Sequence, residues 1–550
     1  MNLAMIRVTR MIGFSGQGRG SPSLRQMALA TALPVLLAAC QSSGPGAGTV
    51  GYVRGFLGGV AGDEPQAVII ARDVLSAGGS AADAAVAAYF TMAVTYPSAA
   101  SLGSGGACLV HDREKSAIEA LDFTHPTTGA LAGIPVPASP RGMFLLHAKY
   151  GRLPWAQLVA PGEGLARFGN VASRALVRAL AEAPGVLQDP AARAIFGGAA
   201  GGAVREGEKI QQFQLATALG LLRREPGQFF AASFARRVAE AYREAGVAMT
   251  ADNIRDYRPR FRAPVSVKRG NQAAEFAPTP AGVVAAQMWA MLYRERIYAR
   301  EGEDERPHLI AEVSRRAFAD AGRWFGPPGV VGEPVQAMVE EGRIKRLLDG
   351  FRRSGVGPVS VEGTPRPGPE PRDQGSASVV AADRDGQSVA CAFTMNGIMG
   401  SAKVAAGTGI VIAAPPDPAG RGVPALALMV QRLEVQDQAE YVGAATGGAV
   451  APVALVTTAL GIMEDNRGAE AALAGPRFYR AAQPDRVMLE DRPDARPIAD
   501  LLRRSGHDVA FGPPAMGRVN VYTCPEGFEP ERGKCDVRTD RRGHGLAQQN

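Results

Sequence analysis

Apolar residues recur at the spacing of α-helices through the first part of the chain, from about residue 66 to about residue 350. The clearest of these stretches are 216–224, 231–245 and 310–325. The alanine-rich run 81–93 has a high helix propensity, and Ser80 followed by Asp83 forms the pattern of a capping box. Pro97 is expected to end this helix. The sequence therefore predicts a helix-rich first part.

From residue 378 the pattern changes to short apolar runs separated by turn residues, which predicts β-strands. Two such runs, 378–382 and 387–394, flank an Asp-Arg-Asp-Gly sequence, and an Asp-Gly pair in this position is a strong hairpin signal. A further strand is predicted at 409–413. The preceding segment, 354–377, is rich in glycine and proline, so we expect a flexible linker there.

The start of the chain has the pattern of a targeting segment, residues 1–40. Its apolar stretch, 27–36, is too short to span a membrane. The sequence Leu-Ala-Ala-Cys that ends at Cys40 resembles a bacterial lipobox, in which the cysteine is lipidated after the signal peptide is cleaved. Residues 41–51 are predicted to be a flexible tether. We therefore expect a periplasmic lipoprotein that is held at the membrane by its lipid anchor.

Charge and histidine spacing exclude two classes of function. The formal net charge is +7, but four arginines lie in the first 40 residues, which contain no acidic residue. The mature chain is therefore close to neutral, and nucleic acid is not an expected partner. The six histidines have no metal-ligand spacing, so neither a metal nor a cofactor is expected.

The five cysteines divide into three groups. Cys40 is assigned to lipidation. Cys524 and Cys535 bracket a turn-rich loop, and in an oxidising compartment they are expected to form a disulfide. Cys108 and Cys391 stand in apolar, strand-like contexts and are predicted to be buried thiols.

A series of motifs follows along the chain: Gly78-Gly79-Ser80-Ala81-Ala82-Asp83, Tyr96-Pro97, Gly103-Ser104-Gly105-Gly106, Thr250-Ala251-Asp252-Asn253, Ala277-Pro278-Thr279-Pro280-Ala281-Gly282, His308-Leu309-Ile310-Ala311-Glu312 and Asp540-Arg541-Arg542-Gly543. In their order these motifs resemble those of the γ-glutamyltransferase (γ-glutamyltranspeptidase) family. The resemblance covers residues 52–547. Enzymes of this family cleave themselves to expose a catalytic threonine, whose own α-amine acts as general base.

The resemblance implies an α+β fold, the αββα four-layer sandwich of N-terminal-nucleophile hydrolases. It divides the chain into a large-subunit-like region, 52–353, a linker at the self-cleavage position, 354–377, and a small-subunit-like region, 378–550. The two regions are expected to pack together. The expected partner is a small γ-glutamyl compound or another amide.

The sequence has an unsuitable residue at the family's nucleophile position when Ser378-Val379-Val380 is aligned with the family's nucleophile strand. The nucleophile position is then Gln374, followed by Gly375, and glutamine has no nucleophilic oxygen for this role. Ser376 is the nearby hydroxyl. It lies two positions further on and keeps the same strand face, but this alignment displaces it by roughly 6.5 Å, which is beyond hydrogen-bond reach.

Other catalytic positions of the family are retained. Thr394 and Asn396 match its Thr-x-Asn sequence, and Gly447-Gly448 matches the glycine pair of its oxyanion hole. Each also has a structural interpretation, because Thr394 suits a strand and the glycines suit a tight strand-to-helix turn.

The family's substrate-binding positions are mostly lost. Thr124 follows Leu121-Asp122-Phe123 where the family has a carboxylate-binding arginine, and a threonine cannot replace a bidentate guanidinium. Asp417 is the remaining candidate for the ammonium-binding acid. Residues 425–428 carry no hydroxyl where the family has paired serines.

These losses favour a catalytically degenerate lipoprotein of the family that is not self-processed and retains ligand binding. The alternative is an active γ-glutamyl hydrolase or transferase, or a related amide acylase of altered specificity, with Ser376 exposed by cleavage after Gly375. A third hypothesis is a structural envelope lipoprotein that uses the Cys524–Cys535 loop as a contact element.

Overall fold

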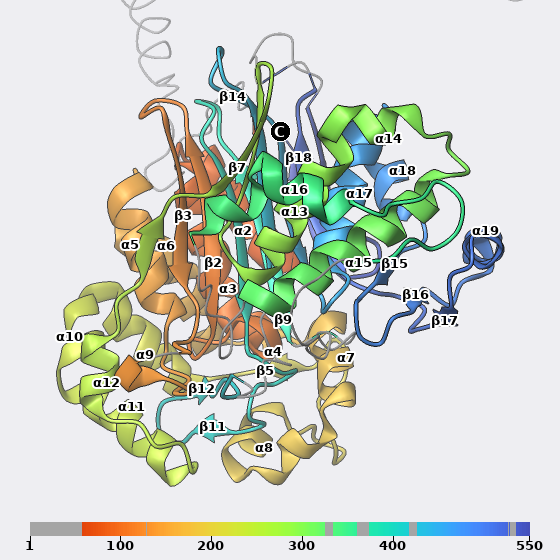
Figure 1. Ribbon diagram of the computed structural model, residues 1–550. Helices are drawn as coiled ribbons and strands as arrows, with labels where there is room; N and C mark the ends of the chain where they lie inside the picture. Colours follow the sequence, from red (N-terminus) through yellow and green to blue (C-terminus); the bar gives the residue numbers. More distant parts are fainter. Residues whose placement is uncertain are drawn as a thin grey trace, which may run out of the picture. The chain divides into compact units, whose positions relative to one another are not determined.

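Two antiparallel β-sheets face each other at the centre of the structure, and helices cover the outer face of each sheet (Figure 1). The first sheet has the strand order β20 (Leu546–Gln549), β1 (Gly59–Gly62), β9 (Ser376–Ala382), β10 (Ser388–Thr394), β2 (Gly105–Asp112), β3 (Ala117–Phe123) and β6 (Arg260–Arg262). The second has the order β19 (Asp536–Arg538), β18 (Arg518–Thr523), β14 (Gln438–Thr446), β13 (Ala427–Leu433), β8 (Gln272–Phe276) and β7 (Val265–Arg269). The predicted αββα sandwich is confirmed.

The computed structural model describes residues 58–127, 129–324, 334–359, 373, 375–416, 426–525, 527 and 535–549. Residues 53–550 belong to one compact unit. The predicted targeting segment and tether lie outside the described residues, and so do Cys40, Gln374 and Asp417.

Each sheet has its own helical layer. The first is covered by α2 (Pro65–Ser76), α3 (Ala81–Thr95) and α5 (Ser139–Tyr150), with α6 (Trp155–Phe168) and α9 (Phe213–Arg224) outside α3. The second is covered by α13 (Pro280–Tyr293) and α17 (Ala451–Met463), with α15 (Arg306–Trp324) beside α13. Further elements are α4 (Pro97–Ala100), α7 (Arg174–Glu182), α8 (Pro190–Phe196), α10 (Pro226–Ala231), α11 (Ser233–Glu244), α12 (Ala251–Asp256), α14 (Ile297–Arg300), α16 (Glu341–Leu348), α18 (Ala469–Ala474), α19 (Arg496–Arg504), β4 (Asn170–Val171), β5 (Lys209–Ile210), β11 (Val404–Ala405), β12 (Ile410–Val411), β15 (Phe478–Arg480), β16 (Val487–Leu489) and β17 (Val509–Phe511).

Local sequence signals explain the central helix and the central hairpin. Ser80 caps α3 by accepting a hydrogen bond from the Asp83 amide, and the Asp83 carboxylate accepts one from the Ser80 amide, so the predicted capping box is confirmed. The predicted hairpin is the pair β9 and β10. However, β9 begins at Ser376, two residues earlier than the pattern predicts, and the strand expected at 409–413 is reduced to the two residues of β12.

The strands from the two halves of the chain interleave in the first sheet. Strands β9 and β10 follow the linker, yet they lie between β1 and β2, which precede it. The layer between the two sheets is built largely from small buried side chains, among them Ala61, Ala107, Ala382, Ala390 and Ala444. The regions before and after the linker therefore share one core.

Two disulfides form among the described residues, one at the layer between the sheets and one among the buried residues between the first sheet and its helices. One joins Cys524 to Cys535, the pair expected from the sequence. The other joins Cys108 on β2 to Cys391 on β10, which are register partners on neighbouring strands. The prediction that Cys108 and Cys391 are free thiols was therefore wrong, because two apolar strand segments 283 residues apart give no local sign of being paired.

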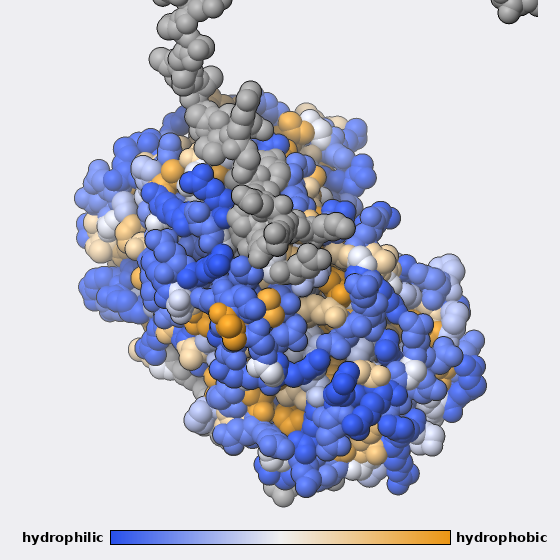
Figure 2. Space-filling view, turned by 90° about the horizontal axis from the view of Figure 1, so that it is seen from above, coloured by the Kyte–Doolittle hydropathy of each residue, from blue (hydrophilic) through white to orange (hydrophobic). Residues whose placement is uncertain are grey.

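The surface visible in Figure 2 is mostly hydrophilic over its described residues, with apolar residues in small separate groups. No helix within the described ranges has both the length and the apolar character required to cross a membrane.

Candidate active site

Ser376 is the first residue of β9, and its hydroxyl lies against one of the two predicted oxyanion-hole glycines. The Gly447 amide donates to Ser376 Oγ at 3.2 Å, and Ser376 Oγ donates to Asp373 Oδ1 at 2.8 Å. The register of the first sheet sets Ser376 opposite Thr394. Ser376 is thus the hydroxyl that contacts Gly447, although the alignment on Ser378 assigns the family's nucleophile position to Gln374.

The glycine pair forms the turn between β14 and α17. Gly447 and Gly448 have φ angles of 99° and 92°, a conformation that side chains other than glycine rarely adopt. A Cβ on Gly447 would lie 2.7 Å from the Gly517 Cα, so the turn also needs glycine for space. The same geometry directs the Gly447 N–H toward Ser376 Oγ, so a turn that the fold needs also presents a hydrogen-bond donor to this hydroxyl.

The side chain of Asn396 is fixed by hydrogen bonds from its nitrogen, while its amide oxygen accepts none from the described residues. Its Nδ2 donates to the Ala414 carbonyl at 2.9 Å and to His125 Nδ1 at 2.9 Å, and its backbone amide donates to Thr394 Oγ1 at 3.0 Å. A carbonyl can only accept, so the nitrogen must face Ala414 and the oxygen must face the other way. Among the described residues, the buried Asn396 Oδ1 has no hydrogen-bond partner. It is an acceptor available to a new donor.

His125 fixes this orientation and was not identified from the sequence. Its Nε2 donates to the Gly103 carbonyl at 3.1 Å, which leaves Nδ1 as the acceptor for Asn396. Burial lowers the pKa of His125 to about 4, so the imidazole is neutral at physiological pH. Its position beside Asn396 depends on the tertiary fold, because 271 residues separate the two.

This shift predicts a loss of stability in acid. The unfolded chain takes up the His125 proton below about pH 6.5 and the folded chain only near pH 4, so stability falls as the pH falls through this window, by about 3 kcal/mol. Denaturant unfolding at a series of pH values should show this loss in the wild type, and a His125→Asn variant should show a shallower loss. Parallel curves for the two proteins would contradict the assignment.

A cavity of about 430 Å³ opens beside Ser376. Its lining residues include Asp373, Gly375 and Gly447 from the surroundings of the serine, and Arg518 from β18. The side chains that line it further include Asp63, Arg178, Glu182, Arg542 and His544. This volume lies within the range of sites for small organic ligands.

The structure does not bring Thr124 into the lining of this cavity. The Thr124 hydroxyl instead donates to Asp122 Oδ1 at 2.7 Å. Arg518 instead contacts the surroundings of Ser376: its Nη2 donates to the Ser376 carbonyl at 2.7 Å and its Nη1 to Asp373 Oδ2 at 2.7 Å. Sequence reasoning missed Arg518, which lies outside every motif that carries the family resemblance.

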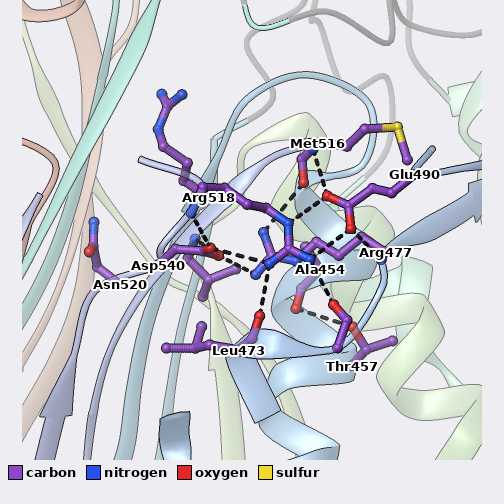
Figure 3. A network of polar contacts seen from close by, with 12 residues as sticks. Ala454, Thr457, Leu473, Arg477, Glu490, Met516, Arg518, Asn520 and Asp540 are labelled. Atoms are coloured by element: carbon purple, nitrogen blue, oxygen red, sulfur yellow. Dashed lines mark hydrogen bonds and ion pairs between the residues drawn. The ribbon is translucent and has the colours of Figure 1, made fainter. Parts of the chain in front are cut away.

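The start of β18, and with it Arg518, is fixed by a buried charge network (Figure 3). Glu490 accepts from the amides of Arg477 and Met516 at 2.9 and 2.8 Å. Asp540 accepts from the Val519 amide at 3.1 Å and pairs with the Arg477 guanidinium. The residues on either side of Gly517-Arg518 are therefore held by buried carboxylates.

The four-layer sandwich defines the chain as a protein of the N-terminal-nucleophile hydrolase fold. The chain belongs to the γ-glutamyltranspeptidase family, whose sequence model matches residues 67–414.

Individual relatives agree with this assignment. The chain is 30% identical over 395 residues to the glutathione hydrolase proenzyme of Pseudomonas aeruginosa, covering 64% of this chain and 67% of that protein. It is 26% identical over 526 residues to the glutathione hydrolase proenzyme of Escherichia coli K12, covering 86% and 90%. Among solved structures, a cephalosporin acylase from Bacillus halodurans matches with a TM-score of 0.75 at 21% identity, covering 92% and 98% of the two chains. That last likeness concerns the fold.

Proposed function

We propose that the chain is a self-processing amide hydrolase or acyltransferase whose nucleophile is Ser376, unmasked by cleavage of the Gly375–Ser376 bond. One observation carries the proposal: Ser376 Oγ lies between the Asp373 carboxylate and the Gly447 N–H. A hydroxyl next to both a proton acceptor and an oxyanion donor has the surroundings that an activated nucleophile requires. The designation of two relatives as proenzymes agrees with self-processing.

Self-cleavage follows from the groups around the bond. Ser376 Oγ attacks the Gly375 carbonyl carbon, and Asp373 takes the hydroxyl proton. The Met395 amide, which donates to the Gly375 oxygen at 2.9 Å, stabilises the negative charge that develops there. The carbon–nitrogen bond breaks, the nitrogen receives the proton, and water hydrolyses the resulting ester to a free Gly375 carboxylate and a free Ser376 hydroxyl and amine.

Substrate turnover then uses the new amine. An α-amino group has a pKa near 8, so a neutral fraction is available to take the proton from Ser376 Oγ. The unpaired Asn396 Oδ1 supplies an acceptor that can orient this amine. Ser376 Oγ attacks the substrate amide, the Gly447-Gly448 turn stabilises the oxyanion, the amine product leaves with the proton, and water or an acceptor amine releases the acyl group.

The disulfide arrangement predicts how the cleaved protein will migrate on a gel. Cys108 and Cys391 lie on opposite sides of the Gly375–Ser376 bond, so their disulfide keeps the two fragments covalently linked. A denaturing gel should show one band without reductant and two bands with it. The variant Cys391→Ser should show two bands in both lanes. One band in the reduced lane of the wild type would contradict self-cleavage.

Turnover itself is tested with a panel of acyl anilides. The processed protein should release aniline and acquire the mass of the acyl group on the fragment that begins at Ser376. Failure to acylate that fragment with any member of the panel, despite cleavage, would contradict the hydrolase part of the proposal.

An unprocessed ligand-binding protein is the second candidate. Thr124 favours it, because the hydroxyl is committed to Asp122 and the family's arginine anchor has no counterpart at that position. This candidate predicts a single band in the reduced lane together with stabilisation of the uncut chain by small amides or amino acids.

We also propose that Cys40 is lipidated and that the mature protein is anchored in the periplasm. The Leu-Ala-Ala-Cys sequence supports this. The variant Cys40→Ser should move the protein from the membrane fraction to the soluble fraction, and an unchanged distribution would contradict the anchor.

A further inference from the structure

Asp373 and Ser376 stand on either side of the bond proposed for cleavage and contact each other directly. The amide and the hydroxyl of Ser376 both donate to Asp373 Oδ1, at 3.2 and 2.8 Å. Between them, Gly375 has a φ angle of 62°, and a Cβ at this position would clash with the Gly397 carbonyl oxygen. The chain therefore takes a special conformation at the bond, and this conformation decides how the Ser376 hydroxyl lies relative to the Gly375 carbonyl carbon.

Arg518 contacts both sides of the same bond. Its Nη1 donates to Asp373 Oδ2 at 2.7 Å, and its Nη2 donates to the Ser376 carbonyl at 2.7 Å. Asp373 precedes the Gly375–Ser376 bond and the Ser376 carbonyl follows it, so one guanidinium joins the two chain segments. A guanidinium is a planar and rigid fork of donors, whereas the ammonium of a lysine is a point charge on a flexible stem.

The fork reaches the bond from the second sheet. Arg518 is the register partner of Thr446 on β14, the residue before the Gly447 turn, whereas Ser376 begins β9 in the first sheet. Asp63, which follows β1, lies 3.6 Å from Arg518 Nε. The strand pair that carries the Gly447 donor thus also carries the guanidinium that holds β9 against this donor.

The charge of Arg518 is permanent. Its side chain is only 14% exposed, and burial alone would lower its pKa, but the Asp373 and Asp63 carboxylates raise the pKa well above its ordinary value. The contact to Asp373 is therefore a charge-assisted hydrogen bond, which is stronger and more directional than one between neutral groups.

We infer that Arg518 is the positioning residue for self-cleavage: its fork holds Asp373 and Ser376 in the arrangement in which Ser376 Oγ attacks the Gly375 carbonyl carbon. The inference rests on the proposed function for the reaction and adds the residue on which its first step depends. Arg518 takes up no proton and forms no bond with the reacting carbon. Its loss leaves the nucleophile in the chain but no longer fixes the two segments, and a displacement of about 1 Å costs a factor on the order of 10² in rate.

The cavity wall offers a matched control. Arg178 lines the same cavity as Arg518, but its Nε pairs with Glu182 at 3.0 Å on the same helix, α7. The two side chains of this pair are 56% and 46% exposed, so their contact contributes little to the structure. A change at Arg178 alters an arginine of this wall without touching the bond.

The rate of cleavage in newly made protein tests the inference. The chain is made in an oxidising cell-free system, and timed samples are separated on a reducing gel. Arg518→Lys, which keeps the charge but loses the fork, should be cut slower than the wild type by a factor on the order of 10², whereas Arg178→Lys should be cut at the wild-type rate.

A variant without the side chain separates positioning from a general loss of structure. Arg518→Ala should be cut as slowly as Arg518→Lys or more slowly. Guanidinium chloride, far below denaturing concentrations, should speed its cleavage at least about tenfold, because the free cation can enter the cavity and form the same two hydrogen bonds. Ammonium chloride at the same concentration should have no such effect.

Cleavage of Arg518→Lys at the wild-type rate would overturn the inference. Equal effects of guanidinium and ammonium on Arg518→Ala, with the fold intact by circular dichroism, would overturn it as well. Arg518→Lys keeps a cation between Asp63 and Asp373, so it decides the question even if Arg518→Ala does not fold. A wild type that is never cut removes the proposed function and the inference together, whereas a wild type that is cut no faster than Arg518→Lys removes the inference alone.

Discussion

Replacing Ser376 by alanine should leave the chain uncut and without amide hydrolase activity while the fold remains intact. In the proposed reaction, Ser376→Ala removes the atom that attacks both Gly375 and the substrate, and the loss of a nucleophile lowers kcat by a factor on the order of 10⁴ to 10⁶. The fold should tolerate the change, because the side chain is small and makes its hydroxyl contacts to Asp373 and Gly447 alone among the described residues. A gel run under reducing conditions shows whether the chain is cut, and turnover of the acyl anilides measures the activity. Far-UV circular dichroism shows whether the fold is intact.

Ser378 offers the matched control. It lies on the same face of β9 two residues further on, and its hydroxyl contacts Asp63 and Asn520 rather than the glycine turn. Ser378→Ala should still be cut before Ser376. Cleavage that persists in Ser376→Ala, or that disappears in Ser378→Ala with the fold intact, would show that the wrong serine has been assigned.

Replacing Glu490 by alanine should cost the largest amount of stability, about 3–5 kcal/mol, because it breaks a buried ion pair on one side. Glu490, which is labelled in Figure 3, is fully buried. Its Oε2 accepts from Arg542 Nη2 at 2.7 Å. Without it, Arg542 keeps its charge in the interior, and the amides of Arg477 and Met516 lose their acceptor. Urea unfolding of the purified variant measures the loss.

An exposed ion pair nearby serves as the control for the loss of stability expected in Glu490→Ala. Arg492 and Asp494 are joined at 2.6 Å, but Asp494 is 53% exposed. Asp494→Ala should therefore change the free energy of unfolding by less than about 1 kcal/mol. Similar losses in the two variants would mean that the Glu490 network does not hold the start of β18.

The sequence predicted the elements of the fold better than the geometry of the site. The capping box at Ser80 and the Asp-Gly hairpin are local signals, and the structure contains both. The position of the proposed nucleophile is not a local property. An alignment on Ser378-Val379-Val380 favours Gln374, whereas pairing with Thr394 brings Ser376 to the glycine turn. A shift of two residues keeps the strand face, so the hydrophobic pattern cannot detect it.

The remaining site residues depend on contacts between distant segments. His125 reaches Asn396 across 271 residues, and Arg518 reaches Ser376 across 142. Each would be an ordinary histidine or arginine in a linear sequence. The Cys108–Cys391 disulfide was missed for the same reason, since its partners meet through the register of β2 and β10.

The mass of the intact, reduced protein tests the central claim most directly, because it asks whether Ser376 becomes a chain end. We predict two species, one of which has the mass of residues 376–550 and yields serine, then alanine, then serine on N-terminal sequencing. A single species with the mass of the whole mature chain, unchanged after prolonged incubation, would contradict self-processing and leave a ligand-binding protein with its nucleophile still masked.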